Sequence, residues 1–208
     1  MTSPPIDADR LLEGVEALRA IDPDLAGIAE RHGPPPLWAR EPGFDTLVRI
    51  ILEQQVSLAS GAAAHRRLVA AAGAVEPEAI VAAGEERLRD AGLTRQKARY
   101  VTVLATDIVA GRVDLEAIAA ADDDEARRGL TAILGIGRWT ADIYLLMALG
   151  RPDIWPSGDL ALAGSMRWAK RLPSLPTSAE QETIALAWRP WRAVAARLLW
   201  HAYLSGER

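Results

Sequence analysis

No stretch of the chain alternates apolar and polar positions in the way that a half-buried strand does. Alanine and leucine are abundant and aromatic residues are few, which favours helices. Asp7 and Asp22 can cap the first two helices, and the prolines at 34–36 form a stiff break after the second. We expect helices at about 7–20, 22–32, 77–83, 85–91, 94–111, 178–187 and 190–205, two in 44–73 that meet near Gln55–Ser57, and one that begins in the acidic run 122–125.

The most informative pattern lies in residues 130–162, which have the sequence LTAILGIGRWTADIYLLMALGRPDIWPSGDLAL. Gly135 and Gly137 lie between two helical segments, so the backbone there can turn sharply and approach a ligand closely. The free amides at the start of the second helix can hold a phosphate group. An ordinary helix–helix connection with a glycine cap explains the same turn.

Composition excludes several kinds of site. The chain has 208 residues, half of them hydrophobic, which is enough for one compact domain or two closely packed lobes. It contains no cysteine, which excludes disulfides, thiol nucleophiles, cysteine-ligated zinc and an iron–sulfur cluster. The three histidines lie far apart without metal-ligand spacing. No apolar run has membrane-spanning length and the first residues lack a signal-peptide core, so we expect a cytoplasmic protein.

The net charge is −4, which by itself argues against a nucleic-acid partner. The acidic excess lies in residues 1–90, whereas residues 91–208 carry slightly more basic than acidic side chains. Arginine supplies nearly all the positive charge, because Lys97 and Lys170 are the only lysines. This distribution disfavours a tight, salt-sensitive nucleic-acid binder and is compatible with weak electrostatic attraction to DNA.

Four motifs follow one another along the chain: ILEQQVS at 51–57, ILGIGRWTA at 133–141, WPSGD at 155–159 and WRPWR at 188–192. In this order and spacing they resemble the helix-hairpin-helix (HhH-GPD) DNA glycosylases, and among these the 3-methyladenine DNA glycosylase II type. The resemblance covers about residues 10–205. The chain departs from it at Leu134, where many members have proline, and at Gly158, where similar members have an acidic residue. Neither departure removes a chemical group that the family's cleavage of glycosidic bonds requires.

The resemblance implies an all-α, two-lobed helix-hairpin-helix glycosylase fold with the active-site cleft between the lobes. Residues 44–155 would form the central helical lobe, which carries the hairpin. The N-terminal helices in residues 1–43 would pack with residues 156–208, whose helices complete the second lobe.

The family's catalytic aspartate falls on Asp159. This residue follows Pro156-Ser157-Gly158 and can begin a helix, where the amides and the helix dipole favour a carboxylate. Cleavage of the bond between an alkylated purine and its sugar builds positive charge on the deoxyribose. A fixed carboxylate can stabilise that charge and orient the attacking water. The alternative is that Asp159 is only a helix cap, which is common for aspartate after glycine.

Trp139 separates this chain from the lyase-type members of the family, in which the same position holds a lysine that forms a Schiff base. Tryptophan cannot do this, so the resemblance implies a monofunctional enzyme that leaves an intact abasic site. Trp139 and Trp200 fall on base-pocket positions, where an aromatic face attracts a cationic alkylated purine by about 0.5–2 kcal/mol. A further pocket position holds Ile143, with Tyr144 one residue later. The alternative for the tryptophans is core packing.

The polar residues Gln54, Gln55 and Ser57 interrupt an apolar run, which indicates a solvent-exposed helix junction or a loop that enters the minor groove. The resemblance places Gln55 in the gap left by a flipped base. It assigns further DNA contacts to the hairpin residues Gly135, Gly137, Arg138 and Thr140. It also implies a monovalent cation that bridges to a DNA phosphate, bound by the main-chain carbonyls of Thr131, Ile133 and Ile136.

Together with these patterns, the resemblance implies a monomeric DNA glycosylase that acts on double-stranded DNA in base excision repair, without membrane association. It would flip out and hydrolytically release alkylated purines of the 3-methyladenine and 7-methylguanine type, with no cofactor beyond the hairpin cation. The alternatives are a non-catalytic helix-hairpin-helix DNA-binding protein, a helical scaffold, and a glycosylase for mismatched or deaminated bases. Asp159 and the tryptophans disfavour simple binding, which requires neither.

Overall fold

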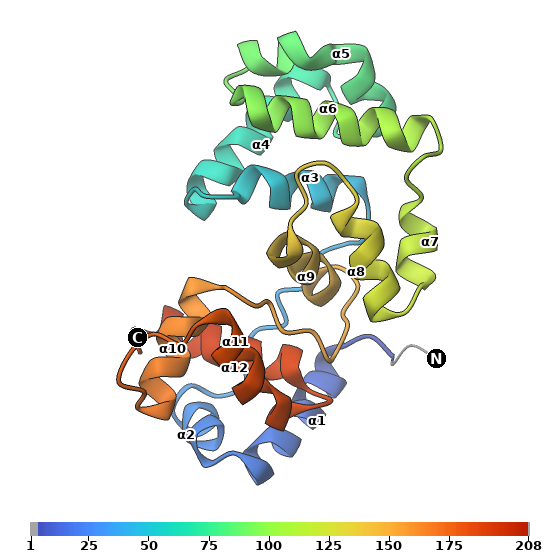
Figure 1. Ribbon diagram of the computed structural model, residues 1–208. Coiled ribbons are helices and arrows are strands. Elements are labelled where there is room, and N and C mark those ends of the chain that lie inside the picture. The colour runs from blue at the N-terminus through green and yellow to red at the C-terminus, as the bar shows by residue number, and fades with distance from the viewer. Residues whose placement is uncertain (1–3, 208) are drawn as a thin grey trace. The chain divides into compact units, whose positions relative to one another are not determined.

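The computed structural model describes residues 4–207, and every regular element among them is helical (Figure 1). The all-α fold class predicted from the sequence is therefore confirmed. The elements are α1 (Ala8–Ile21), α2 (Pro23–His32), α3 (Phe44–Glu53), α4 (Leu58–Ala72), α5 (Pro77–Asp90), α6 (Arg95–Val109), α7 (Leu115–Ala120), α8 (Asp123–Thr131), α9 (Arg138–Met147), α10 (Leu160–Lys170), α11 (Ser178–Ala185), the 3-10 helix η1 (Leu186–Trp188) and α12 (Arg192–Leu204). Within the described residues, no helix is long and apolar enough to cross a membrane.

Side-chain caps begin several helices at the residues that the sequence indicates. The carboxylate of Asp7 accepts a hydrogen bond from an amide three residues later at 2.9 Å, and Asp122 does the same at 2.8 Å. Each cap satisfies an amide that has no partner within its own helix. The predicted starts of α1 and α8 are confirmed.

The predicted helices at 77–83 and 85–91 are confirmed as the two parts of α5, which meet in a kink at the non-helical residue Gly84 (φ 74°, ψ 160°). One element differs from the sequence-based prediction. The sequence pattern does not predict α7, because six residues are too few to display a helical apolar period. Asp114 begins this helix by accepting hydrogen bonds from two amides, each at 2.9 Å.

The chain divides into two compact units. Unit 1 contains the residues up to Ala39 and those from Leu145 onward, and so includes α1, α2 and α10–α12. Unit 2 contains Arg40–Tyr144, and so includes α3–α8 and most of α9. The boundaries proposed from the sequence, after residues 43 and 155, lie further along the chain at both junctions.

Unit 1 contains a buried charged junction centred on Asp22, whose exposed fraction is 7%. Its carboxylate caps α2, accepts the indole N–H of Trp188 at 2.6 Å and pairs with the Lys170 ammonium at 2.7 Å. Burial alone would raise the pKa of Asp22, but the hydrogen bonds from these donors outweigh burial and lower it. The junction joins the start of α2 to the end of α10 and to η1.

We predict that Asp22→Asn lowers the free energy of unfolding by about 2–3 kcal/mol at pH 7, because the half-buried Lys170 ammonium loses its nearest counter-charge. The lowered pKa means that the Asp22 carboxylate stabilises the fold above its unfolded-state pKa of about 3.9. This stabilisation is lost as the pH falls through the folded-state value. The difference between wild type and variant should therefore shrink below about pH 4.

Urea unfolding measured between pH 3 and pH 7 tests this prediction. Asp122→Asn is the matched control, because Asp122 is also an N-cap but is exposed, and asparagine caps equally well. A destabilisation by Asp22→Asn no larger than that of the control would contradict the role of the junction.

Candidate functional site

Asp159 begins α10, as the sequence indicates, and its Oδ1 accepts the Leu162 N–H at 2.9 Å. The loop that precedes Asp159 contains the buried residues Trp155 and Pro156. Gly158 then adopts φ +84°, a left-handed conformation that residues with a side chain rarely adopt. The glycine at this position therefore has a backbone reason, since it turns the chain sharply into the helix.

Asp159 has a second contact that helix capping does not require. The indole N–H of Trp200, on α12, donates to Asp159 Oδ1 at 3.3 Å. Trp200 is 9% exposed, so its ring is held within unit 1 beside the carboxylate. The fold thus brings together two predicted site residues that lie 41 positions apart in the sequence.

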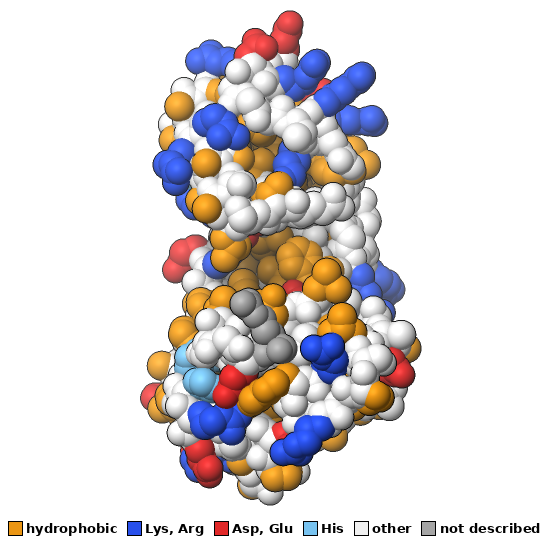
Figure 2. All heavy atoms as spheres, turned by 90° about the vertical axis from the view of Figure 1, so that its left-hand side faces the viewer, with side chains coloured by type: hydrophobic (Ala, Val, Ile, Leu, Met, Phe, Trp, Pro, Cys, Tyr) orange, Lys and Arg blue, Asp and Glu red, His pale blue; other side chains and the backbone are white. Residues whose placement is uncertain are grey.

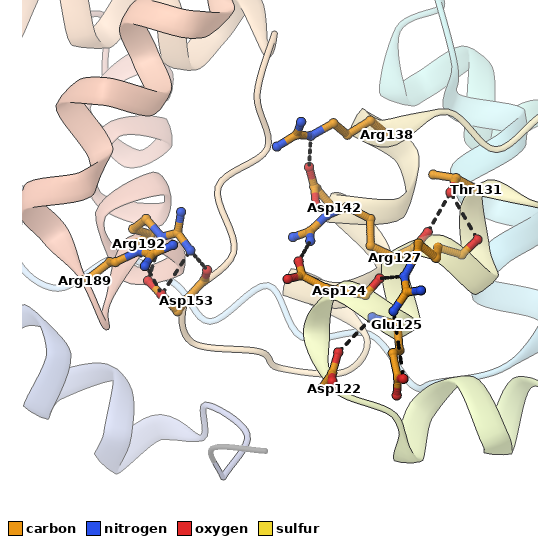
Figure 3. Close-up of polar contacts among 11 residues, drawn as sticks. Asp122, Asp124, Glu125, Arg127, Thr131, Arg138, Asp142, Asp153, Arg189 and Arg192 are labelled. Atoms are coloured by element: carbon orange, nitrogen blue, oxygen red, sulfur yellow. Dashed lines mark hydrogen bonds and ion pairs between the residues drawn. The ribbon is translucent and has the colours of Figure 1, made fainter. Parts of the chain in front are cut away.

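The WRPWR motif clamps the loop that leads to Asp159. Arg192 donates from Nε to the Asp153 carboxylate at 2.7 Å and from Nη2 to the Asp153 carbonyl at 2.6 Å. Arg189 lies 3.5 Å from the same carboxylate. Figure 3 shows both arginines directed at Asp153. Because Asp153 precedes Asp159 by six residues, this clamp fixes the loop relative to α12.

The hairpin lies in unit 2, between α8 and α9. The Ile136 N–H donates to the Ile133 carbonyl at 3.0 Å and closes the turn. Gly135 has φ +88°, and a Cβ atom there would overlap the ring of Tyr100. Only glycine fits this position, for both reasons. Gly137 is exposed at the start of α9.

The remaining predicted residues of α9 differ in exposure. The side chain of Arg138 is 60% exposed, and Trp139 is half-buried. Ile143 and Tyr144 are buried in unit 2, where the Tyr144 hydroxyl oxygen accepts the Gly43 N–H at 2.9 Å. Burial raises the pKa of Tyr144.

A buried ion pair joins the two helices of the hairpin, and no pattern in the sequence predicts it. Asp142 of α9 is fully buried and lies 2.7 Å from Arg127 Nε of α8 and 3.8 Å from Arg138 Nε. Figure 3 shows Asp142 directed at both arginines. Burial alone would lower the pKa of Arg127, but the hydrogen bond to Asp142 outweighs it and raises the pKa. The pair fixes the crossing of α8 and α9 and restrains Arg138 at the hairpin.

The loop between α3 and α4 is braced from two sides. The Lys97 ammonium donates to the carbonyls of Leu52 and Gln54 at 2.8 and 2.9 Å, and burial lowers the pKa of Lys97. The Gln54 amide in turn donates to the Gly135 carbonyl and to the Thr140 hydroxyl, both at 3.0 Å. Gln54 therefore fastens this loop to the hairpin.

Gln55 differs from its polar neighbours. It is exposed and has φ +57°, a left-handed conformation that is strained for glutamine. Ser57 caps α4 through the Ser60 N–H at 3.2 Å, and Gln54 bonds within unit 2. Ser57 is exposed too, but its hydroxyl caps α4, whereas Gln55 is exposed in a left-handed backbone conformation.

Exposed cations gather on unit 2, in the upper part of Figure 2. The exposed arginines of α4 and α6, and of the end of α5, are Arg66, Arg67, Arg87, Arg89, Arg95 and Arg99.

Within residues 4–207, no three histidine or acidic side chains form a group that could hold a metal ion. The Thr131 hydroxyl donates to the Arg127 carbonyl at 2.8 Å, and this bond does not involve the main-chain carbonyl of Thr131.

The chain is similar in sequence to two bacterial proteins whose names refer to DNA repair. A putative DNA-3-methyladenine glycosylase of Bacillus subtilis, YfjP, is 26% identical over 86% of this chain and 65% of its own length. A probable bifunctional transcriptional activator/DNA repair enzyme AlkA of Mycobacterium tuberculosis is 33% identical over 89% of this chain and 38% of its own length. The chain thus spans less than two thirds of each of these relatives.

Solved structures show the same fold. The 3-methyladenine DNA glycosylase Mag1 of Schizosaccharomyces pombe, in complex with abasic DNA, has a TM-score of 0.84 and 25% identity, covering 94% of this chain and 98% of its own. A DNA-3-methyladenine glycosidase of Bacillus halodurans has a TM-score of 0.81 and 30% identity, covering 91% and 88%. The model of the HhH-GPD superfamily of base excision DNA repair proteins matches residues 48–193, which contain the hairpin, Asp159 and the arginine clamp. The chain therefore belongs to the HhH-GPD superfamily of base excision DNA repair proteins.

Proposed function

We propose that the protein is a monofunctional DNA glycosylase that flips alkylated purines out of double-stranded DNA and hydrolyses their glycosidic bonds. The observation that carries the proposal is the Asp159 carboxylate, held at the start of α10 with the Trp200 indole on the same oxygen. The names of the relatives, and the abasic DNA bound to Mag1, support this activity and this partner.

The carboxylate of Asp159 has the chemistry that the reaction requires. Departure of the purine leaves positive charge on the deoxyribose, and a fixed carboxylate can stabilise that charge and orient a water molecule. The Leu162 amide and the Trp200 indole hold the side chain in one orientation, so little reorganisation is needed during the reaction. Alkylated purines are cationic and leave readily, so a strong general acid is not needed.

The environment of the lysines supports hydrolysis without a Schiff base. Trp139 occupies the position of the lyase lysine. The chain has two lysines, of which Lys97 donates to carbonyls of the α3–α4 loop and Lys170 pairs with Asp22. Each amine therefore has structural partners, and neither lysine occupies the position of the lyase lysine.

We propose that Trp139 and Trp200 contact the cationic base, since an aromatic face attracts a cation by about 0.5–2 kcal/mol. Gln55 would fill the gap that the base leaves, which its exposure at the loop tip supports. The exposed hairpin residues Gly137 and Arg138 would bind a DNA phosphate. Because Gln54 and Thr140 bond to each other, we infer that they act on DNA through the placement of the loop and hairpin.

The hairpin carbonyls suit a monovalent cation in their chemistry. Carbonyl oxygens are hard ligands, and each has two lone pairs, so the Ile136 N–H on the Ile133 carbonyl does not exclude a cation there. The carbonyls of Thr131, Ile133 and Ile136 would hold it, and its charge would attract a DNA phosphate.

We further infer that the protein acts as a cytoplasmic monomer.

We predict that Asp159→Asn lowers the release of methylated purines by about 10²- to 10³-fold while DNA binding and folding are kept. The asparagine oxygen can still accept from the Leu162 amide and the Trp200 indole, so the change removes the charge alone. The measurement is chromatography of bases released from methylated DNA. Asp7→Asn is the matched control, because it makes the same change at the cap of α1. Unchanged turnover in Asp159→Asn would refute the assignment and favour a DNA-binding role.

We predict that borohydride does not trap a covalent complex between the protein and DNA, because neither lysine is available to form a Schiff base. The DNA strand should break only after alkali or a separate lyase acts on the abasic site. The measurement is gel electrophoresis after borohydride treatment, with a lyase-type glycosylase as positive control. A trapped complex that disappears on substitution of Lys97 or Lys170 would overturn the monofunctional mechanism.

We predict that Gln55→Gly raises the free energy of unfolding by about 0.5–1 kcal/mol, because glycine adopts φ +57° without strain. The same variant should bind duplex DNA with an abasic site about five- to tenfold more weakly, since nothing then fills the gap. Gln55→Ala separates the two effects, because alanine also lacks the amide but keeps the backbone strain. Equal losses on abasic and undamaged DNA would show that Gln55 is a general DNA contact.

A further inference from the structure

Trp38 is an aromatic residue in an unusual backbone conformation. It follows the prolines at 34–36 and has φ +48°, in the left-handed region. This conformation costs an L-residue with a side chain about 1–2 kcal/mol, and bulky residues seldom adopt it. Backbone strain of this kind is retained where a side chain must point in one direction, and it is common at functional sites.

A buried arginine fixes the backbone immediately before Trp38. The Arg197 guanidinium donates to the carbonyls of Leu37, Leu146 and Ala193 at 2.9, 2.9 and 3.1 Å. Arg197 is 1% exposed, and burial lowers its pKa to about 10, so it stays protonated at neutral pH. A buried charge is costly, and here its hydrogen bonds are used to hold main-chain carbonyls. The position of Trp38 is therefore determined by α12.

The side chain of Trp38 extends the site already described. Its ring meets the ring of Trp200 edge to face, with centroids 6.4 Å apart and an interplanar angle of 77°. Trp200 in turn donates to the Asp159 carboxylate. Three segments of unit 1, before α3, at the start of α10 and within α12, thus bring Trp38 and Asp159 into contact with the same residue, Trp200.

Core packing does not explain Trp38 well. The tryptophans that pack the core of unit 1, Trp155 and Trp188, are 3% and 1% exposed, and their rings contact each other. Trp38 is only half-buried, although its neighbour Trp200 is buried. A strained, partly exposed tryptophan beside a buried one leaves aromatic surface available to a ligand.

We propose that Trp38 is a specificity-determining residue, whose ring forms with Trp200 an aromatic wall that contacts the extruded cationic purine. This inference rests on the proposed glycosylase function and adds a residue outside the four sequence motifs. Trp200 lies nearer the carboxylate, and Trp38 extends the wall toward solvent. Aromatic surface next to a carboxylate favours a cation over a neutral base, because the π-face of a ring and the carboxylate both attract positive charge.

The test compares Trp38→Leu and Trp38→Phe with wild type. Both variants keep a side chain at the left-handed position, so the backbone strain is matched, but leucine removes the aromatic face. We expect Trp38→Leu to lower kcat/KM for 7-methylguanine release by about five- to thirtyfold, and Trp38→Phe to restore most of it. Affinity for duplex DNA with an abasic site should not change in either variant, because that DNA has no base for Trp38 to contact.

Trp168→Leu is the control, since Trp168 lies on α10 of the same unit, leaves part of its ring exposed and faces Arg31 instead of Trp200. It should change neither base release nor abasic-site binding. If Trp38→Leu is fully active, or if it loses base release, abasic-site binding and unfolding midpoint together, Trp38 is a structural residue and the inference is overturned. A wild-type chain that releases no methylated purine would instead overturn the proposed function, and this inference with it.

Discussion

The placement of α10 depends on charged and polar contacts at both of its ends. At its C-terminal end, Lys170 pairs with the buried Asp22 carboxylate, which also caps α2. At its N-terminal end, Asp159 caps the helix and accepts the indole N–H of Trp200 from α12. A helix fixed at two ends cannot slide or rotate without breaking buried hydrogen bonds, each of which is costly to leave unmade. The orientation of the proposed catalytic carboxylate is therefore a consequence of the core of unit 1.

Unit 2 uses polar contacts in a similar way to hold two loops together. The Gln54 amide joins the α3–α4 loop to the hairpin, while Lys97 binds the last carbonyls of α3. Beneath them, the Arg127–Asp142 pair locks α8 to α9. These contacts explain how a strained residue such as Gln55 persists at the loop tip, because its neighbours over-determine the backbone. Loop and hairpin are thereby fixed to each other.

Much of the helical architecture could be predicted from local chemistry. Asp7, Asp22 and Thr94 mark helix starts because an oxygen side chain before an apolar segment satisfies a free amide, whatever the rest of the chain does. Gly135 marks the hairpin turn for an equally local reason. Where the local signal was weak, as in the six residues of α7, the prediction missed an element.

The sequence by itself determined the all-helical class, the hairpin and the aspartate at the start of α10, because helix period, capping and glycine geometry act over a few residues. Only the tertiary structure decided which of three similar polar residues is exposed in a left-handed backbone conformation, and which tryptophan touches Asp159. Trp38 and Arg197 illustrate the reason, since they meet the site only through contacts between segments far apart in the chain. A buried ion pair such as Arg127–Asp142 likewise has no local pattern, because its stability comes from burial that a linear sequence does not display.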